Sequence, residues 1–231
     1  MCADTSRIPR RLPRGSHGLD PELVAASQRG RLLEAVGRAV ADKGYAGATI
    51  DEIVRRAGVS KMTFYEHFRD KEDCFIAAYE AASEELLERV RAAQSGPDGW
   101  LERTRAGIRA YLRWLAGDPA LARAFLIEVA AAGPRAAECR ERLRDRWADL
   151  IRELQDEARA EIPSLPRLPA EIFQALVAAV DDLVVRRIRA AGAHELPELE
   201  PVLLHLEVAL LAGPEMAAES ATAAGSSPVN G

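Results

Sequence analysis

The sequence has few of the residues from which catalytic and metal sites are built. It contains three cysteines and four histidines, and no two cysteines form a Cys-x-x-Cys pair. An odd number of widely spaced cysteines argues against a disulfide framework and against a zinc knuckle. The signature motifs of α/β-hydrolases, dinucleotide-binding proteins, P-loop NTPases and zinc proteases are missing, as is the Glu-x-x-His pair of di-iron bundles. We therefore expect no enzyme, no metal and no cofactor.

Long apolar runs are also lacking. The best candidate, residues 172–185, is interrupted by Asp181 and Asp182, so no segment reaches the roughly 18 uncharged apolar residues that a membrane helix needs. Arg10 and Arg11 are not followed by an apolar stretch, which argues against a secretory signal and favours the cytoplasm. Alternating strands rich in Val, Ile and Thr are absent, whereas apolar residues recur with a helical period. We expect an all-α fold.

The chain has a net negative charge, but its positive charge is concentrated near the start. The net charge is −5, yet residues 1–70 carry 12 Lys and Arg against 9 Asp and Glu, while residues 71–231 carry 19 against 27. This asymmetry is typical of a small basic module on a larger acidic body.

Capping signals divide the chain into about nine helices and five regions. The first helix starts after Asp20 and runs to Lys43, where Gly44 suits a left-handed stop. The second opens with a capping box of Thr49 and Glu52, each expected to bind a free backbone N–H. Ser60 caps a third helix to about residue 68, and Asp70 caps a fourth to about residue 90. Further helices are expected near residues 98–116, 119–132, 135–160, 169–191 and 197–211. The predicted regions are an arm (1–19), a helix-turn-helix (20–70), a linking helix (71–90), a larger domain (91–211) and a disordered tail (212–231).

The short helix that opens at Ser60 has two distinct faces. At about 100° per residue, Phe64 and Phe68 share one side and are expected to anchor it, while Met62, Thr63 and Glu66 lie opposite. Tyr65 and His67 flank this exposed face. The second helix of a helix-turn-helix can enter the major groove of DNA, where the central face meets bases and the flanking groups meet phosphates. Lys61, Lys71 and Thr49 could add phosphate contacts. The same geometry also occurs as plain core packing.

Residues 27–90 resemble the DNA-binding domain of the tetracycline-repressor (TetR) family of bacterial regulators. The resemblance rests on residues 49–73, TIDEIVRRAGVSKMTFYEHFRDKED. It implies that Tyr65, His67 and Lys71 hold phosphates and that Lys61, Met62 and Thr63 face bases, with Ser60 as the cap. A carboxylate is less usual at the position of Glu66, which we expect to discriminate between bases rather than to attract DNA.

The N-terminal arm is a second candidate DNA element. Arg7, Arg10, Arg11 and Arg14 resemble the minor-groove arms of other helix-turn-helix proteins. The alternative is a disordered, solubilising tail, and the sequence does not decide between them.

The resemblance implies an effector-binding and dimerisation domain in residues 91–211. The candidate liners of an effector cavity are Tyr111, Trp114, Phe125, Glu128, Trp147 and Phe173, although aromatic residues on helical stripes more often belong to the core. The last two long helices carry apolar stripes wider than one intrachain contact needs. We expect a homodimer interface there, formed by Leu176, Val180, Leu183, Val184, Val202, Leu203, Leu206 and Leu210.

The sequence thus predicts a sequence-specific transcriptional regulator with no membrane partner. It would repress transcription from a pseudo-palindromic operator until a small-molecule effector of unknown identity releases it. An activator or an effector-independent regulator on the same fold is the alternative, and an enzyme is disfavoured by the missing motifs.

Overall fold

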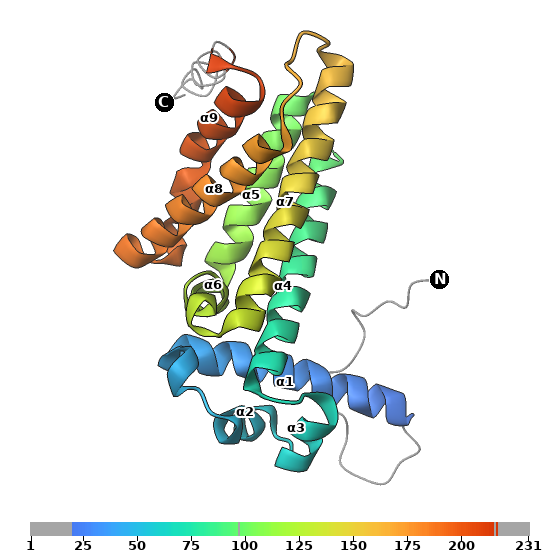
Figure 1. Ribbon diagram of the computed structural model, residues 1–231, viewed down its shortest axis with the longest axis vertical. Coiled ribbons are helices and arrows are strands. Elements are labelled where there is room, and N and C mark those ends of the chain that lie inside the picture. Colours follow the sequence, from blue (N-terminus) through green and yellow to red (C-terminus); the bar gives the residue numbers. More distant parts are fainter. Residues whose placement is uncertain (1–19, 97, 215, 217–231) are drawn as a thin grey trace, which may run out of the picture.

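Every regular element of the described chain is a helix. The computed structural model describes residues 20–96, 98–214 and 216, and Figure 1 shows these ranges as a helical bundle above a small helical head. The α-helices are α1 (Pro21–Gly47), α2 (Ile50–Ala57), α3 (Lys61–His67), α4 (Lys71–Gln94), α5 (Trp100–Gly117), α6 (Pro119–Leu126), α7 (Pro134–Glu161), α8 (Ala170–Ala191) and α9 (Glu200–Leu211). Two 3-10 helices, η2 (Glu128–Ala131) and η3 (Ala193–Leu199), complete the set. The all-α expectation is confirmed.

The capping residues start the first four helices where the sequence indicated. The side chains of Asp20, Thr49, Ser60 and Asp70 accept hydrogen bonds from backbone N–H groups in the first turns of α1, α2, α3 and α4. Such caps satisfy donors that the helix itself leaves free. Gly44, at φ 71°, breaks the regular helix as expected. The chain then makes one more turn to Gly47, so α1 ends beyond the predicted stop.

Two boundaries in the second half differ from the expectation. The helix predicted over residues 119–132 ends at Leu126 and continues as the 3-10 helix η2. The helix predicted from residue 197 begins at Glu200, because residues 193–199 form η3 with Pro197 inside it. Proline has no N–H to donate, so a regular α-helix does not continue through this position.

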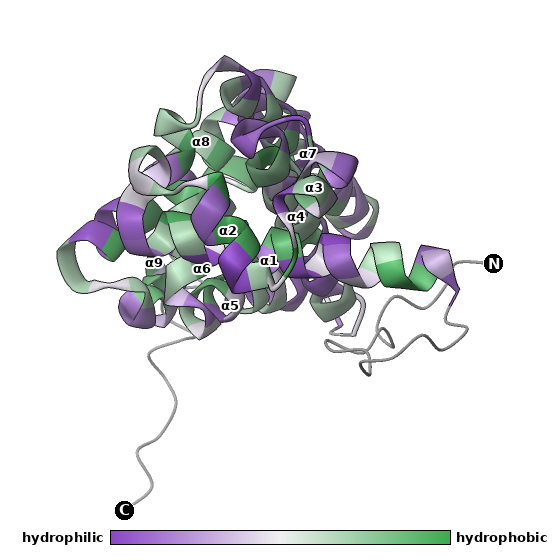
Figure 2. Ribbon diagram, turned by 90° about the horizontal axis from the view of Figure 1, so that it is seen from below, coloured by the Kyte–Doolittle hydropathy of each residue, from purple (hydrophilic) through white to green (hydrophobic). Residues whose placement is uncertain are grey.

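The helices form a head and a body. In Figure 1, α1 lies across the lower end with α2 and α3 beneath it, while α4, α5 and α7 rise as long helices with α8 and α9 beside them. Figure 2 looks onto the end formed by α1, α2 and α3. The linking helix α4 belongs to both parts, since it begins directly after α3 and ends deep in the body.

The core of the head continues into the body. The buried cluster under α1–α4 includes Phe125 of α6, Val129 of η2, and Ala136, Cys139 and Leu143 of α7. A second cluster joins α4, α5, α7, α8 and α9, and a smaller one joins α7, α8 and α9. Because close packing leaves little free space, a shift of α6 or α7 would displace the side chains of the head that pack against them. No helix among the described residues is long and apolar enough to span a membrane.

The two cysteines in the described ranges are buried and free. Burial raises the pKa of Cys74 to about 12 and that of Cys139 to about 11. A thiol that stays protonated at neutral pH reacts slowly, so Cys74 serves as a small apolar core residue rather than a redox sensor.

Candidate nucleic-acid interface and effector cavity

Two phenylalanines hold α3 against the head. Phe64 is fully buried and Phe68 is 4% exposed, and their ring centroids lie 5.8 Å apart. Arg29 of α1 lies over the Phe68 ring, 5.4 Å from its centroid. The predicted anchoring face is therefore the buried one, and the short helix α3 is positioned by packing rather than by its own length.

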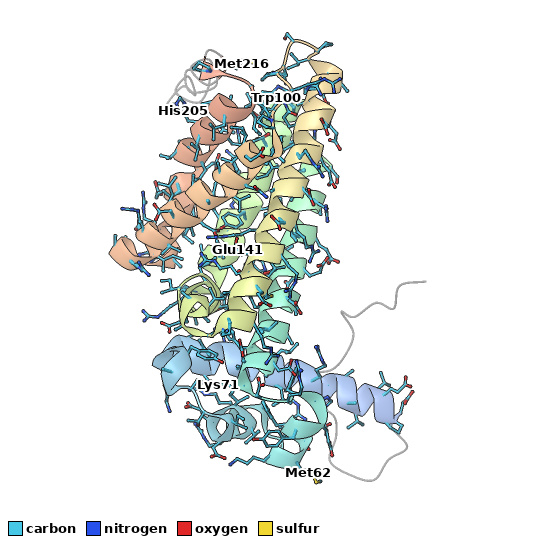
Figure 3. The ribbon with its side chains drawn as sticks, viewed as in Figure 1. Met62, Lys71, Trp100, Glu141, His205 and Met216 are labelled. Atoms are coloured by element: carbon cyan, nitrogen blue, oxygen red, sulfur yellow. The ribbon has the colours of Figure 1, made fainter. Side chains whose placement is uncertain are left out.

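The opposite face of α3 is open. Met62 is 73% exposed and Tyr65 is 57% exposed, which are high values for side chains of this kind. Figure 3 shows Met62 at the outer tip of the head. Lys61 and Glu66 are also exposed, whereas Thr63 and His67 are half-buried. An exposed helix face that carries apolar, hydroxyl and charged groups together has the mixture needed to read base edges and phosphates.

Several of these side chains already have partners within the head. The Ser60 hydroxyl accepts a hydrogen bond from the Thr63 amide at 3.0 Å, and the two hydroxyl oxygens lie 3.0 Å apart. The Lys61 ammonium lies 2.6 Å from an Asp51 carboxylate oxygen. This exposed ion pair raises the pKa of Lys61 and is weak enough to open when a phosphate approaches.

Lys71 points into the protein. Its ammonium donates to the carbonyl oxygens of Tyr45 at 2.6 Å and Ala48 at 2.9 Å, and lies 4.1 Å from the centre of the Tyr45 ring. In Figure 3 it sits between α1 and the start of α4. Two of its three donors are thus used in joining these segments. Only the third is left for the phosphate contact that the sequence predicted.

Glu52 does not complete the predicted capping box. The Thr49 hydroxyl accepts from the Glu52 amide at 3.3 Å, but the buried Glu52 carboxylate binds the cations of Lys43 at 2.5 Å and Arg56 at 2.7 Å instead of the Thr49 amide. These two partners lower the pKa of Glu52. The expectation was wrong because two cations offer the carboxylate stronger hydrogen bonds than a neutral amide does.

Sequence reasoning missed arginines that belong to this end of the molecule. Arg31 of α1 donates to the carbonyl oxygen of Ala57 at 2.9 Å, which fixes the turn between α2 and α3. Arg55 and Arg69 are 71% and 76% exposed and flank that turn and the end of α3. The closeness of Arg55 and Arg69 to α3 in the sequence could have identified them as candidates for phosphate contacts. The arm residues Arg7, Arg10, Arg11 and Arg14 lie outside the described residues.

A cavity lies between the helices of the body. It has a volume of about 80 Å³ and is bordered by residues of α4, α5, α7, α8 and α9. Tyr111 and Trp147 line it as expected, with their rings edge to face at 5.6 Å. A second cavity of about 50 Å³ shares both rings and also contacts Trp114 and Phe125. The Tyr111–Trp147 pair therefore forms a wall between two small cavities.

Two predicted liners lie elsewhere. Glu128 borders neither cavity but accepts a hydrogen bond from the Tyr45 amide at 3.0 Å. Phe173 is buried against α7 and α9 in the smallest core cluster. Both expectations came from apolar periodicity, which cannot show which of several neighbouring helices a buried face meets. The same periodicity places Glu207 on the buried side of α9, and this residue, which borders the first cavity, was overlooked as a candidate liner.

Polar contacts join the head to the body at three places. Arg38 of α1 makes two hydrogen bonds of 2.7 Å to Asp118, which caps α6. Glu128 of η2 binds the end of α1. Arg135, at the start of α7, binds Asp70 at 3.1 Å and Asp73 at 3.0 Å at the start of α4. These contacts connect α6, η2 and α7 directly to α1 and to the start of α4.

Three of the residues predicted for the dimer interface are buried in the core of their own chain. Leu176, Val184 and Leu203 are at most 2% exposed and belong to the intrachain core. They cannot form a surface, so the expectation was wrong for them. Val202 is 50% exposed, while four others are half-buried, namely Val180, Leu183, Leu206 and Leu210. On α9, Val202, Leu206 and Leu210 form a stripe beside the buried face, and Leu206 and Leu210 also pack against the smallest core cluster.

Residues 32–78 match the family model of bacterial regulatory proteins of the tetR family. Over 118 residues the chain is 33% identical to the transcriptional activator FasR of Mycolicibacterium smegmatis, covering 51% of this chain and 54% of FasR. It is 32% identical over 111 residues to the transcriptional repressor Rv1474c of Mycobacterium tuberculosis, covering 43% of this chain and 57% of that protein. The chain thus spans little more than half the length of these two relatives.

The fold is also found among solved structures. The crystal structure of the transcriptional regulator FadR from Bacillus subtilis, in complex with stearoyl-CoA, superimposes with a TM-score of 0.70 at 19% identity. The match covers 80% of this chain and 98% of that one. At this level of identity the likeness establishes the arrangement of helices and nothing about the ligand.

Proposed function

This chain belongs to the TetR family of bacterial regulators, and we propose that it is a ligand-responsive transcriptional repressor. It binds a pseudo-palindromic operator as a homodimer and leaves it when a small molecule enters the body of the protein. Operator binding places it in the cytoplasm. The observation that carries this proposal is α3, a helix fixed by Phe64 and Phe68 that exposes Met62, Tyr65 and Glu66 on its outer face.

The chemistry of the exposed face supports sequence-specific contact. Met62 offers an apolar surface to a thymine methyl group, and Glu66 can accept a hydrogen bond from cytosine N4. The Tyr65 hydroxyl and the His67 ring flank these groups and are suited to phosphate contacts, and Lys61 stands at the start of the helix. The α2 cap Thr49 is exposed and offers a further hydroxyl.

The decisive experiment is selection of bound duplexes from a random DNA pool, followed by gel shifts with the selected site. We expect an inverted repeat and a loss of at least tenfold in affinity for Tyr65→Ala. Arg167→Ala removes a side chain that is exposed near the far end of the body and should bind as the wild type does. A random pool that yields no preferred sequence, or a Tyr65→Ala variant that binds normally, contradicts the proposal.

The effector part of the proposal rests on the cavity and on the contacts between head and body. Val90 and Gln94 near the end of α4 border the cavity, and the same helix begins beside α3. A molecule larger than the cavity must part these helices to enter. The displacement reaches the head through α4 and through the Arg135 ion pairs. A coupling free energy of about 1–3 kcal/mol suffices to weaken operator binding about 5- to 150-fold.

Activation of transcription is the second candidate, because one similar protein is named an activator and the other a repressor. A reporter fused to the identified promoter separates the two in a strain that lacks this gene. Repression predicts higher reporter activity in that strain, whereas activation predicts lower activity.

A further inference from the structure

The cavity of about 80 Å³ bordered by Tyr111 and Trp147 contains polar groups that the described residues leave without partners. Thr104 of α5 is 1% exposed, and its hydroxyl has no hydrogen bond among the described residues. Glu207 of α9 is 8% exposed and has neither a hydrogen bond nor an ion pair within the same part of the chain. Buried polar groups are nearly always satisfied, and an unpartnered carboxyl group is the most costly exception. Two such groups in one cavity indicate a ligand that binds them.

The cavity lining carries acids and no base. Asp181 is its second carboxylate, and Arg144 donates to that group at 2.9 Å. Among the described residues, no Lys, Arg or His borders the cavity, so a phosphate or a carboxylate would find no counter-ion there. A cation, in contrast, would find a counter-ion in Glu207, which has no internal partner, so the lining favours a cation over an anionic head group.

A third acceptor comes from the linking helix. The Gln94 side chain lies across Gly107, where an added Cβ would come within 2.6 Å of the Gln94 amide nitrogen. Gly107 thus leaves room for the amide at the cavity wall. Gln94 also borders an outer hollow with more acidic than basic residues, namely Asp98, Glu153, Glu157 and Glu161 against Arg91 and Arg103. The approach to the cavity past Gln94 has the same sign of charge as its interior.

We propose that the cavity binds an apolar molecule that carries one protonated primary amine, with Glu207 as its counter-ion. The three N–H donors of the ammonium group match three acceptors, the Glu207 carboxylate, the Thr104 hydroxyl and the Gln94 carbonyl. The apolar part packs against Ile108, Tyr111 and Trp147. This inference deepens the proposed function, because it rests on the cavity being the effector site and names the chemical class of the effector.

Binding of an ammonium group to Glu207 should be accompanied by release of a proton. Burial raises the pKa of Glu207 to about 8, so its carboxyl is mostly protonated at pH 7. The other titratable groups that border the cavity are Tyr111, whose pKa burial raises well above 10, and Asp181, which Arg144 already binds. An ammonium ligand must therefore displace one proton, from Glu207. Its affinity should rise about fivefold between pH 7 and pH 8, as the ionised fraction of a group with that pKa does.

Isothermal titration of the full chain without DNA tests this with three probes of equal chain length, octylamine, 1-octanol and octanoate. We expect octylamine to bind at least tenfold more tightly than 1-octanol, and octanoate to bind most weakly. Titrations at pH 7 in buffers of different ionisation enthalpy should show release of about one proton per octylamine and none per 1-octanol. Glu207→Gln should remove the preference for the amine and leave 1-octanol binding within twofold of the wild type.

Glu198→Gln is the matched control, since it neutralises an exposed carboxylate just before α9. It should keep the preference. Tighter binding of octanoate, an amine preference that survives Glu207→Gln, or no binding of any probe overturns the inference. A chain that binds octylamine as described but never binds DNA contradicts the proposed function alone. A chain that binds its operator but not octylamine contradicts this inference alone.

Discussion

The ammonium group of Lys71 binds the backbone where α1 ends and α2 is about to begin. The carbonyl oxygens of Tyr45, in the last turn of α1, and of Ala48, directly after it, both accept hydrogen bonds from this group, and the Tyr45 ring covers it from one side. Burial lowers the pKa of Lys71. This residue stabilises the head whether or not its third donor reaches a phosphate.

Replacing Lys71 with methionine tests that structural role. We expect Lys71→Met to lower the free energy of unfolding by about 1–3 kcal/mol, because two partly buried carbonyl groups lose their donor. Urea denaturation followed by circular dichroism measures the change. Lys61→Met removes an exposed lysine whose ion pair with Asp51 is screened by solvent, and it serves as the control. Equal losses in the two variants would show that water replaces the Lys71 ammonium without cost.

Glu207 makes the stability of the body depend on pH. Its pKa is 4.5 in the unfolded chain and about 8 in the folded one, so between these values the folded state holds a proton that the unfolded state has released. The stability due to the neutral carboxyl is complete below pH 4.5. It declines as the pH rises and is lost above about 8.

Glu207→Gln should remove this decline. We expect the variant to gain stability relative to the wild type as the pH rises from 5 to 8, by at most about 1.4 kcal/mol per pH unit. Urea denaturation at pH 5, 6.5 and 8 measures the difference, in which the titrations of all other groups cancel. A constant difference across this range would mean that Glu207 is ionised in the folded protein at every pH tested.

The roles that could be predicted from the sequence belong to residues whose contacts lie within one or two helical turns. The four caps and the burial of Phe64 and Phe68 follow from spacing along a single helix. Lys71, Glu52 and Glu128 were assigned differently because long polar side chains choose among partners that only the tertiary structure brings near. Glu128, for example, contacts an amide 83 positions away in the chain. Local pattern carries no information on such a choice.

At the level of elements, Asp118 joins two helices that belong to different parts of the molecule. One of its carboxylate oxygens caps α6 through the Leu121 amide at 3.1 Å and also accepts from Arg38 of α1. The helix ranges were predictable because Pro119 and the capping Asp mark the start of α6. The 3-10 segments were not, because the course of η2 is set by its packing against α1 and α6, and that of η3 by its packing against α5 and α8.

The contact between α1 and α6 can be measured with a double-mutant cycle. We expect a coupling free energy of about 0.5–1 kcal/mol between Arg38→Ala and Asp118→Asn, since the pair is partly exposed but makes two parallel hydrogen bonds. Asparagine keeps the cap of α6, so the cycle isolates the ion pair. Urea denaturation of the four proteins supplies the values. Strict additivity would show that this pair does not join the head to the body.

For the whole molecule, the proposed function makes operator recognition depend on two heads held at a fixed distance. A single α3 has seven residues and contacts few base pairs, so one head alone binds weakly. Two heads on one rigid dimer engage half-sites about 34–36 Å apart, and the second contact becomes intramolecular once the first is made. The outer stripe of α9, formed by Val202, Leu206 and Leu210, is the surface that we propose for this pairing.

A charge in that stripe should separate the dimer without unfolding the chain. Val202 is half exposed, so Val202→Asp costs little in the monomer, whereas pairing two copies about a twofold axis would bring two carboxylates into one apolar interface. We expect sedimentation velocity to show monomers and gel shifts to show at least a tenfold loss in operator affinity. Leu23→Asp, which changes an exposed apolar residue near the start of α1, should stay dimeric. A Val202→Asp protein that remains a dimer would place the interface elsewhere, and normal operator binding by a monomer would remove the need for two heads.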